Sequence, residues 1–149
     1  MSNSNGGVYT VIAELPITAS LHIGRRNISF FKSGFYAYVG SALNGLEKRL
    51  ERHLSSQKKF HWHIDYLLES AIVREIVWAT TTVNAECSIA LCLSGELPAV
   101  PGFGCSDCRC RSHLFYSRDV ERVLAKVMNA FEYNNLVIQK QDIKMYGRT

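Results

Sequence analysis

Two apolar segments near the start of the chain constrain its fold more than any other feature. Residues 8–15 (VYTVIAEL) are rich in β-branched and apolar side chains, and residues 35–40 (FYAYVG) form an aromatic run after Gly34. Both compositions favour extended strands. Segments 21–23 and 28–31 between them predict a second, irregular pair of strands. The chain is therefore expected to build a small, mostly antiparallel sheet early.

Apolar spacing predicts helices in the rest of the chain, with one further strand at residues 73–80. Leucines at 46, 50 and 54 form one stripe along a helix over residues 44–54. A second helix is expected after the motif HWH at 61–63. Asn84 is the expected cap of a third helix, and Ser117 is the expected cap of the clearest one, which runs through Phe131 and ends at Asn134-Asn135.

Composition places the chain among ordinary globular proteins. It has 149 residues, 47% hydrophobic and 20% charged, and this is enough apolar material for one core. We expect a single α+β domain over 1–149, with helices flanking the sheet and a polar, basic tail at about 134–149. No apolar run is long enough to cross a membrane and the first residues form no apolar signal region, which predicts a cytoplasmic protein without a membrane partner.

Five residues could together cut a phosphodiester bond: Tyr9, Tyr38, Arg49, His53 and Glu86. Arg49 and His53 lie four residues apart and share one flank of a helix. Arginine can hold a phosphate through two hydrogen bonds, and histidine titrates near neutral pH. A tyrosine beside a cation could help to activate water, and Glu86 offers the single carboxylate with which Mg²⁺ or Mn²⁺ is often held.

Each of these residues also has a purely structural interpretation. Strand tyrosines are commonly packing residues, and an arginine–histidine pair on a helix is commonly a solvated face. Glu86 could simply complement the dipole of the helix that it begins. However, Glu86 falls in line with the apolar residues Ile89, Ala90 and Leu93, so its carboxylate is expected to point inward and to need a partner.

The order of these motifs resembles the GIY-YIG nuclease superfamily. Gly7-Val8-Tyr9 and Tyr38-Val39-Gly40 stand where its members carry two short tyrosine–glycine strands, followed by Arg49, His53 and Glu86. The blocks 38–42 (YVGSA), 62–67 (WHIDYL) and 102–108 (GFGCSDC) are similar to an uncharacterised branch of that superfamily, in which some members are fused to an endonuclease III-type glycosylase. The likeness covers roughly residues 7–116, and one departure is the long segment 16–32 between the two tyrosine motifs.

The resemblance implies a GIY-YIG-like fold and a role for each of the five residues. Tyr9 and Tyr38 would be the active-site tyrosines, Arg49 the phosphate-facing arginine, His53 the accessory histidine and Glu86 the ligand of Mg²⁺ or Mn²⁺. It also implies a DNA substrate and a DNA-repair protein as partner. The net charge of +4 and the pI of about 8.9 suit such an anionic ligand.

Further basic and aromatic residues are candidates for contacts with nucleic acid. These candidates are Arg52, Lys58, Lys59, His63, Arg109 and Arg111. His61, His63 and Asp65 alternate along the chain, so an extended segment would turn all three toward one metal or phosphate pocket. The alternative is that His63 and Asp65 form structural hydrogen bonds where a helix begins.

A cysteine-rich segment provides a second candidate metal site. Cys105, Cys108, Cys110 and His113 supply four nitrogen or sulfur ligands, which is the number that tetrahedral zinc requires. Their spacing is tight, and the alternative is a set of thiols that Arg109 or Arg111 would make sensitive to oxidation.

The sequence thus predicts a divalent-metal-dependent endonuclease that hydrolyses phosphodiester bonds, with DNA as the expected substrate. Two alternatives remain open at this point: a nucleic-acid-binding module without catalytic activity, and a cysteine-rich zinc or redox protein.

Overall fold

The computed structural model describes residues 6–24, 27–104 and 110–142 and confirms the predicted α+β class. Its elements in chain order are β1 (Gly7–Leu15), β2 (Ala19–Ile23), β3 (Asn27–Phe31), β4 (Gly34–Ala42), α1 (Leu46–Leu54), α2 (His63–Leu68), β5 (Ile72–Thr80), α3 (Glu86–Ser94), β6 (Leu114–Ser117), α4 (Val120–Tyr133) and β7 (Gln139–Asp142).

The main sheet has its first strand at its centre. The strand order is β6-β4-β1-β5-β7, and every neighbouring pair is antiparallel. β1 pairs with β4 along its whole length, from Gly7 opposite Ala42 to Leu15 opposite Gly34. This register places Tyr9 opposite Gly40, so the two tyrosine motifs predicted from the sequence lie side by side on the two innermost strands.

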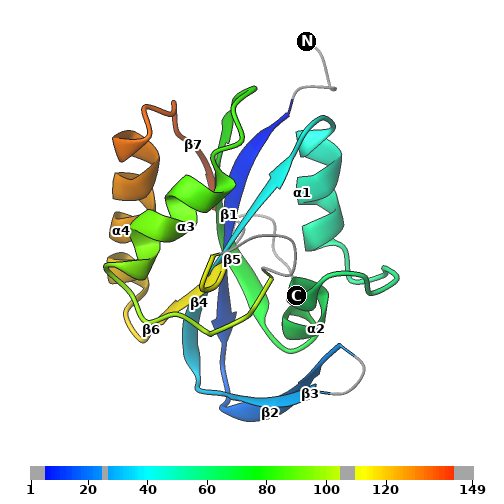
Figure 1. The fold of residues 1–149 in the computed structure, drawn as a ribbon. Coiled ribbons are helices and arrows are strands. Elements are labelled where there is room, and N and C mark those ends of the chain that lie inside the picture. The colour runs from blue at the N-terminus through cyan, green and yellow to red at the C-terminus, as the bar shows by residue number, and fades with distance from the viewer. Residues whose placement is uncertain (1–5, 25–26, 105–109, 143–149) are drawn as a thin grey trace.

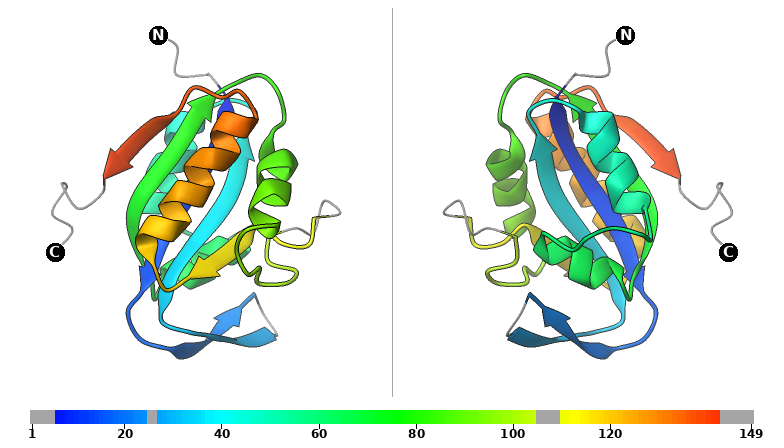
Figure 2. Two further views of the ribbon diagram at one scale, coloured as in Figure 1. Left: turned by 90° about the vertical axis from the view of Figure 1, so that its left-hand side faces the viewer. Right: turned by 90° about the vertical axis from the view of Figure 1, so that its right-hand side faces the viewer.

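Helices cover both faces of this sheet. Figure 1 shows α1 and α2 on one side and α3 and α4 on the other, and the two views of Figure 2 look onto each helical layer in turn. Two separate apolar cores fill the spaces between the layers. In β1, Tyr9 and Val11 face the core under α1 and α2, whereas Val8 and Ile12 face the core under α3 and α4. Burial on both faces explains why β1 is almost continuously apolar.

The segment that separates the two tyrosine motifs forms a hairpin of its own. β2 and β3 pair with each other from Ala19 opposite Phe31 to Ile23 opposite Asn27, and this confirms the predicted second strand pair. The hairpin lies at one end of the molecule, beyond the paired ends of β1 and β4 (Figure 1). The hairpin therefore connects the two motif strands, and β1 and β4 pair with each other up to Leu15 and Gly34 just before and after it.

Two predicted helix caps are wrong. The residue before α3 is Ala85 rather than Asn84, and it makes no side-chain cap. The cap of α4 is Asp119 rather than Ser117, because the Asp119 carboxylate accepts a hydrogen bond from the backbone N–H of Glu121. Ser117 instead accepts a hydrogen bond from the N–H of Asp119, in the turn that leads into the helix. Several neighbouring polar residues could each occupy the N-cap position of a helix, and the sequence alone does not show which of them does.

Two short edge strands were not predicted. β6 pairs with β4, and β7 pairs with β5 at the opposite edge of the sheet. The sequence of β7, QKQD, is polar throughout and lies in the segment described above as a basic tail. An edge strand needs only backbone pairing along one side, so it does not require the apolar alternation that reveals inner strands. Of the described helices, none combines the length and the apolar character that a membrane crossing requires.

Candidate active site

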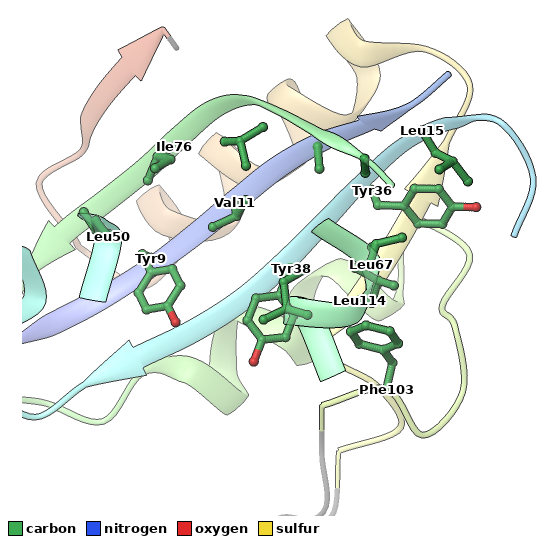
Figure 3. Close-up of a cluster of buried hydrophobic side chains, with 14 of the residues drawn as sticks. Tyr9, Val11, Leu15, Tyr36, Tyr38, Leu50, Leu67, Ile76, Phe103 and Leu114 are labelled. Atoms are coloured by element: carbon green, nitrogen blue, oxygen red, sulfur yellow. The ribbon is translucent and has the colours of Figure 1, made fainter. Parts of the chain in front are cut away.

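Tyr9 and Tyr38 lie on the same face of the sheet, on neighbouring strands. Figure 3 shows both rings projecting from β1 and β4 into the space under α1 and α2. The Tyr9 ring passes over Gly40, where a Cβ atom would lie only 2.4 Å from the Tyr9 hydroxyl oxygen. A glycine is therefore required at position 40 because a larger residue would collide with the Tyr9 ring. Tyr38 lies between the rings of His53 and Phe103, each of which it meets edge-on.

His53 is buried behind Tyr9 and bonds to it. The Tyr9 hydroxyl lies 2.8 Å from Nε2 of His53, whose side chain is 2% exposed. Burial, followed by the charge of Lys58, lowers the pKa of His53 to about 3. Burial also raises the pKa of Tyr9 to about 12, against the opposing effect of a hydrogen bond and charge from Arg49. At neutral pH the contact therefore joins a neutral phenol to a neutral imidazole.

Arg49 is held between a strand end and an indole ring. Its Nη1 donates a hydrogen bond of 2.8 Å to the carbonyl oxygen of Ser41, and its guanidinium lies 4.5 Å from the centre of the Trp62 ring. The indole face attracts a cation, and the carbonyl fixes its direction. Sequence reasoning identified Arg49 and missed Ser41 and Trp62 as the residues that orient it.

Glu86 begins α3 and receives hydrogen bonds at both carboxylate oxygens. Ser41 Oγ donates to Oε1 at 2.6 Å, and Nδ1 of His113 lies 2.8 Å from Oε2. Burial raises the pKa of Glu86, but the hydrogen bonds from His113 and Ser41 outweigh burial and hold the pKa below its usual value. The side chain is therefore an ionised carboxylate at neutral pH, and it is still 23% exposed. This arrangement confirms the inward orientation that was expected for it.

These side chains surround one cavity of about 430 Å³. Four of the five predicted catalytic residues line it, and His53 lies behind them, bonded to Tyr9. β1, β4, α1 and α3 each contribute to the wall, so the site exists only when both helical layers are in place. The full lining is Tyr9, Tyr38, Gly40, Ser41, Arg49, His61, Trp62, His63, Asn84, Glu86, Cys87, Gly104 and His113.

In the alternating motif His61, His63 and Asp65, the aspartate stabilises the start of α2. Asp65 is fully buried, and its Oδ2 accepts hydrogen bonds from the backbone N–H groups of His61 and Trp62. Its pKa lies below the usual value, because hydrogen bonds, chiefly from Arg52, outweigh the effect of burial. His63 accepts a hydrogen bond of 3.0 Å from the backbone N–H of Gly104 through Nδ1. The structural interpretation thus holds for Asp65, while His61 and His63 also line the cavity.

The predicted nucleic-acid contacts are dispersed. Both terminal nitrogens of Arg52 bind Asp65 at 2.9 Å, and Nζ of Lys58 donates to the carbonyl oxygens of Arg52 and His53 at the end of α1. These two cations therefore connect α1 to the segment that follows it. Lys59 and Arg111 are exposed. Arg109 lies outside the described residues.

The predicted zinc ligands are described only in part. Cys105 and Cys108 lie outside the described residues. Cys110 and His113 are brought close to Cys87, such that one ligand atom from each lies within 4.8 Å of the others. Sequence reasoning missed Cys87 because it is distant in sequence and belongs to no cysteine spacing motif. The one available signal was its position directly after the inward-facing Glu86.

A comparison with protein families gives one match. The model of the family described as "Domain of unknown function DUF123" matches residues 8–136, which include every described residue of the cavity. No curated protein and no solved structure matched this chain. Because the match spans most of the sequence, the chain belongs to the DUF123 family.

Proposed function

We propose that the protein is a divalent-metal-dependent endonuclease of the GIY-YIG type, which hydrolyses phosphodiester bonds in DNA. The observation that carries this proposal is the cavity itself. Tyr9, Tyr38, Arg49 and Glu86 were selected on sequence order and resemblance, and they converge on one hollow from four different elements. Tyr9 and Tyr38 also pack in the core under α1 and α2, so the main support comes from the arginine and the carboxylate that face the same cavity.

Glu86 fits the role of a ligand to Mg²⁺ or Mn²⁺. It is an ionised carboxylate that lines the cavity, and Mg²⁺ is commonly held by one or two protein carboxylates together with water. Each carboxylate oxygen accepts one hydrogen bond here and retains a further lone pair. When bound, such a cation would polarise a phosphoryl oxygen and lower the pKa of a bound water.

Arg49 is suited to bind the phosphate. Among the described residues, its hydrogen-bond and ring contacts are with a carbonyl, a phenol and an indole, and none of their carboxylates forms an ion pair with it. A guanidinium of this kind can donate two hydrogen bonds to phosphate oxygens and balance the charge that develops during cleavage. Its anchoring on Ser41 and Trp62 keeps it oriented before the substrate arrives.

Tyr9 and His53 are suited to move a proton from the attacking water. With a pKa of about 12, Tyr9 carries its proton at neutral pH and is not a base by itself. The hydroxyl can pass that proton to Nε2 of His53 at 2.8 Å while its oxygen accepts a proton from water. Because the pKa of His53 is about 3 in the free protein, this transfer depends on the negative charge of a bound phosphate, which stabilises the imidazolium. The water oxygen then forms the new bond to phosphorus as the bond to the leaving oxygen breaks.

DNA is the proposed substrate, and a DNA-repair protein is the proposed partner. Both follow from the resemblance, and the net charge of +4 supports an anionic ligand. Binding should therefore weaken steeply as the salt concentration rises.

The test is cleavage of labelled single-stranded, duplex and branched DNA with Mg²⁺ or Mn²⁺, by the wild type and by Glu86→Ala and Glu86→Gln. Both variants should lose cleavage by about 100-fold or more while DNA binding, measured by fluorescence anisotropy, stays largely intact. Glu47→Gln, an exposed carboxylate in the first turn of α1, is the matched control and should cleave normally.

The other outcomes separate the alternatives. Salt-sensitive binding without cleavage by any form of the protein would overturn the proposal and favour a binding module. Loss of binding and cleavage together in both Glu86 variants, with an altered circular dichroism spectrum, would assign Glu86 a structural role instead.

A further inference from the structure

We propose that Cys87, Cys110 and His113 form a binding site for a zinc ion in the wall of the cavity. These residues come from the first turn of α3, the segment before β6 and the residue preceding β6. Their ligand atoms lie within 4.8 Å of one another. The proposal does not rest on nuclease activity, although the site adjoins Glu86, and it differs from the consecutive cysteine cluster predicted from the sequence because it includes Cys87.

The chemistry of the three ligands favours zinc over the cations expected at Glu86. Thiolate sulfur and imidazole nitrogen are soft or borderline ligands, which suit Zn²⁺, whereas Mg²⁺ and Ca²⁺ require oxygen. Ligand atoms around tetrahedral zinc lie about 3.5–3.8 Å apart, as follows from zinc–ligand bonds of about 2.0–2.3 Å. Because the ligand atoms of the cluster lie within 4.8 Å of one another, no pair must come closer by more than about 1.3 Å to reach that separation.

Glu86 supplies the outer partner that a zinc-binding histidine commonly has. Histidines that bind a metal through one nitrogen usually donate the other N–H to a carboxylate or carbonyl. Nδ1 of His113 lies 2.8 Å from Oε2 of Glu86, so we assign metal binding to Nε2. The imidazole is only 2% exposed, and packing therefore fixes its direction. Three ligands and one oriented carboxylate together form a built site rather than a chance group of thiols.

The site would connect two distant parts of the fold. Cys87 belongs to α3, and Cys110 belongs to the segment that leads into the edge strand β6. Packing in the core under α3 and α4 and the hydrogen bond from Ser41 to Glu86 also hold α3 against the sheet. A zinc ion would join these parts beside Glu86, and it would therefore order one wall of the cavity in which Cys87 and His113 lie.

The test uses the full chain, purified without chelators. Metal analysis should give close to one zinc per chain, and replacement of zinc by Co²⁺ should produce the thiolate-to-cobalt absorption of cysteine ligation. Cys87→Ser and Cys110→Ser should each weaken metal binding strongly and reduce that absorption. Cys92→Ser is the matched control, because Cys92 lies on the same helix outside the cluster, and it should bind metal like the wild type.

Three results would overturn the proposal. The first is a protein that neither contains zinc nor takes up Co²⁺. The second is cobalt binding without thiolate absorption. The third is a Cys87→Ser variant that binds as tightly as Cys92→Ser, which would leave the consecutive cluster as the only candidate set. Cys87 is exposed, so its replacement by serine should not prevent folding, and circular dichroism of the metal-free variants checks this point.

Discussion

At the scale of single residues, the candidate site depends on polar groups that are buried behind the residues lining the cavity. Tyr9 and His53 hold each other at 2.8 Å in an almost solvent-free space, and Gly40 provides the room for the Tyr9 ring. Such buried groups are sensitive to small changes, because a displaced phenol or a charged imidazole finds no water to compensate.

Gly40→Ala should displace Tyr9. The added Cβ would lie 2.4 Å from the hydroxyl oxygen and 2.5 Å from Cζ, so the ring must move. We expect a loss of about 1–3 kcal/mol in the free energy of unfolding and of about 100-fold in cleavage. Denaturant unfolding and the DNA assay measure the two effects. Gly95→Ala is the control, since its Cβ meets nothing closer than 3.8 Å, and equal behaviour of the two variants would refute the argument.

His53 should make stability depend on pH. Its pKa is about 3 in the folded protein and near 6.5 when exposed, so between these values the unfolded chain binds the extra proton. The contribution of His53 to the free energy of unfolding is therefore fully present above about pH 6.5, and it decreases as the pH drops toward 3. In urea unfolding from pH 4 to 7, the wild type should show a slope steeper than His53→Gln by up to about 1.4 kcal/mol per pH unit. Parallel curves would contradict this assignment.

At the scale of elements, one ion pair connects the two helices that cover the tyrosine face. Arg52 of α1 donates two hydrogen bonds of 2.9 Å to Asp65 of α2, and Asp65 also accepts two backbone hydrogen bonds. The Asp65 side chain is fully buried, whereas that of Arg52 is 25% exposed. The guanidinium of Arg52 also lies 4.4 Å from the centre of the Trp62 ring. The contacts of Arg52 with Asp65 and Trp62 therefore fix the position of the indole ring against which Arg49 also packs.

Asp65→Asn should destabilise the protein by about 3 kcal/mol, because it removes the charge from a buried, multiply bonded pair. Glu14→Gln is the matched control. Its partner is Arg74 at 2.8 Å, and both side chains are about one third exposed, so the change should cost less than about 1 kcal/mol. Denaturant unfolding at pH 7 measures both. A similar loss in the two variants would mean that the Arg52–Asp65 pair does not hold the helices together.

At the scale of the whole molecule, the sheet is the middle of three layers. The short strands β6 and β7 form its two edges. The bulge where Ile12 and Ala13 pair with Glu75 and Val73 shifts the alternation of β5. Val73 and Ile76 therefore both face the core under α1 and α2, although one is at an odd position and the other at an even one. β7 covers the outer edge of β5, and Leu136 and Ile138 just before it pack against the other core.

Removal of β7 should weaken the entire domain rather than one edge. A chain that ends at residue 135 loses the pairing with β5 and the partial burial of Leu136 and Ile138. We expect a loss of about 2 kcal/mol and a fall in melting temperature of about 4–8 °C relative to a chain that ends at residue 142. Calorimetry provides the measurement, and identical melting temperatures would show that β7 contributes nothing.

The sequence by itself determined the class of fold, the inner strands, the helices and most of the candidate site. Apolar periodicity is a local property, and the tyrosine, arginine, histidine and glutamate motifs are local as well. Tertiary structure alone decided which buried strand faces meet which helices and how the edges are closed. It also placed Ser41, Trp62 and His113 around the charged residues and brought Cys87 to Cys110. Contacts between residues distant in sequence depend on register and layer packing, and neither leaves a periodic signal in the chain.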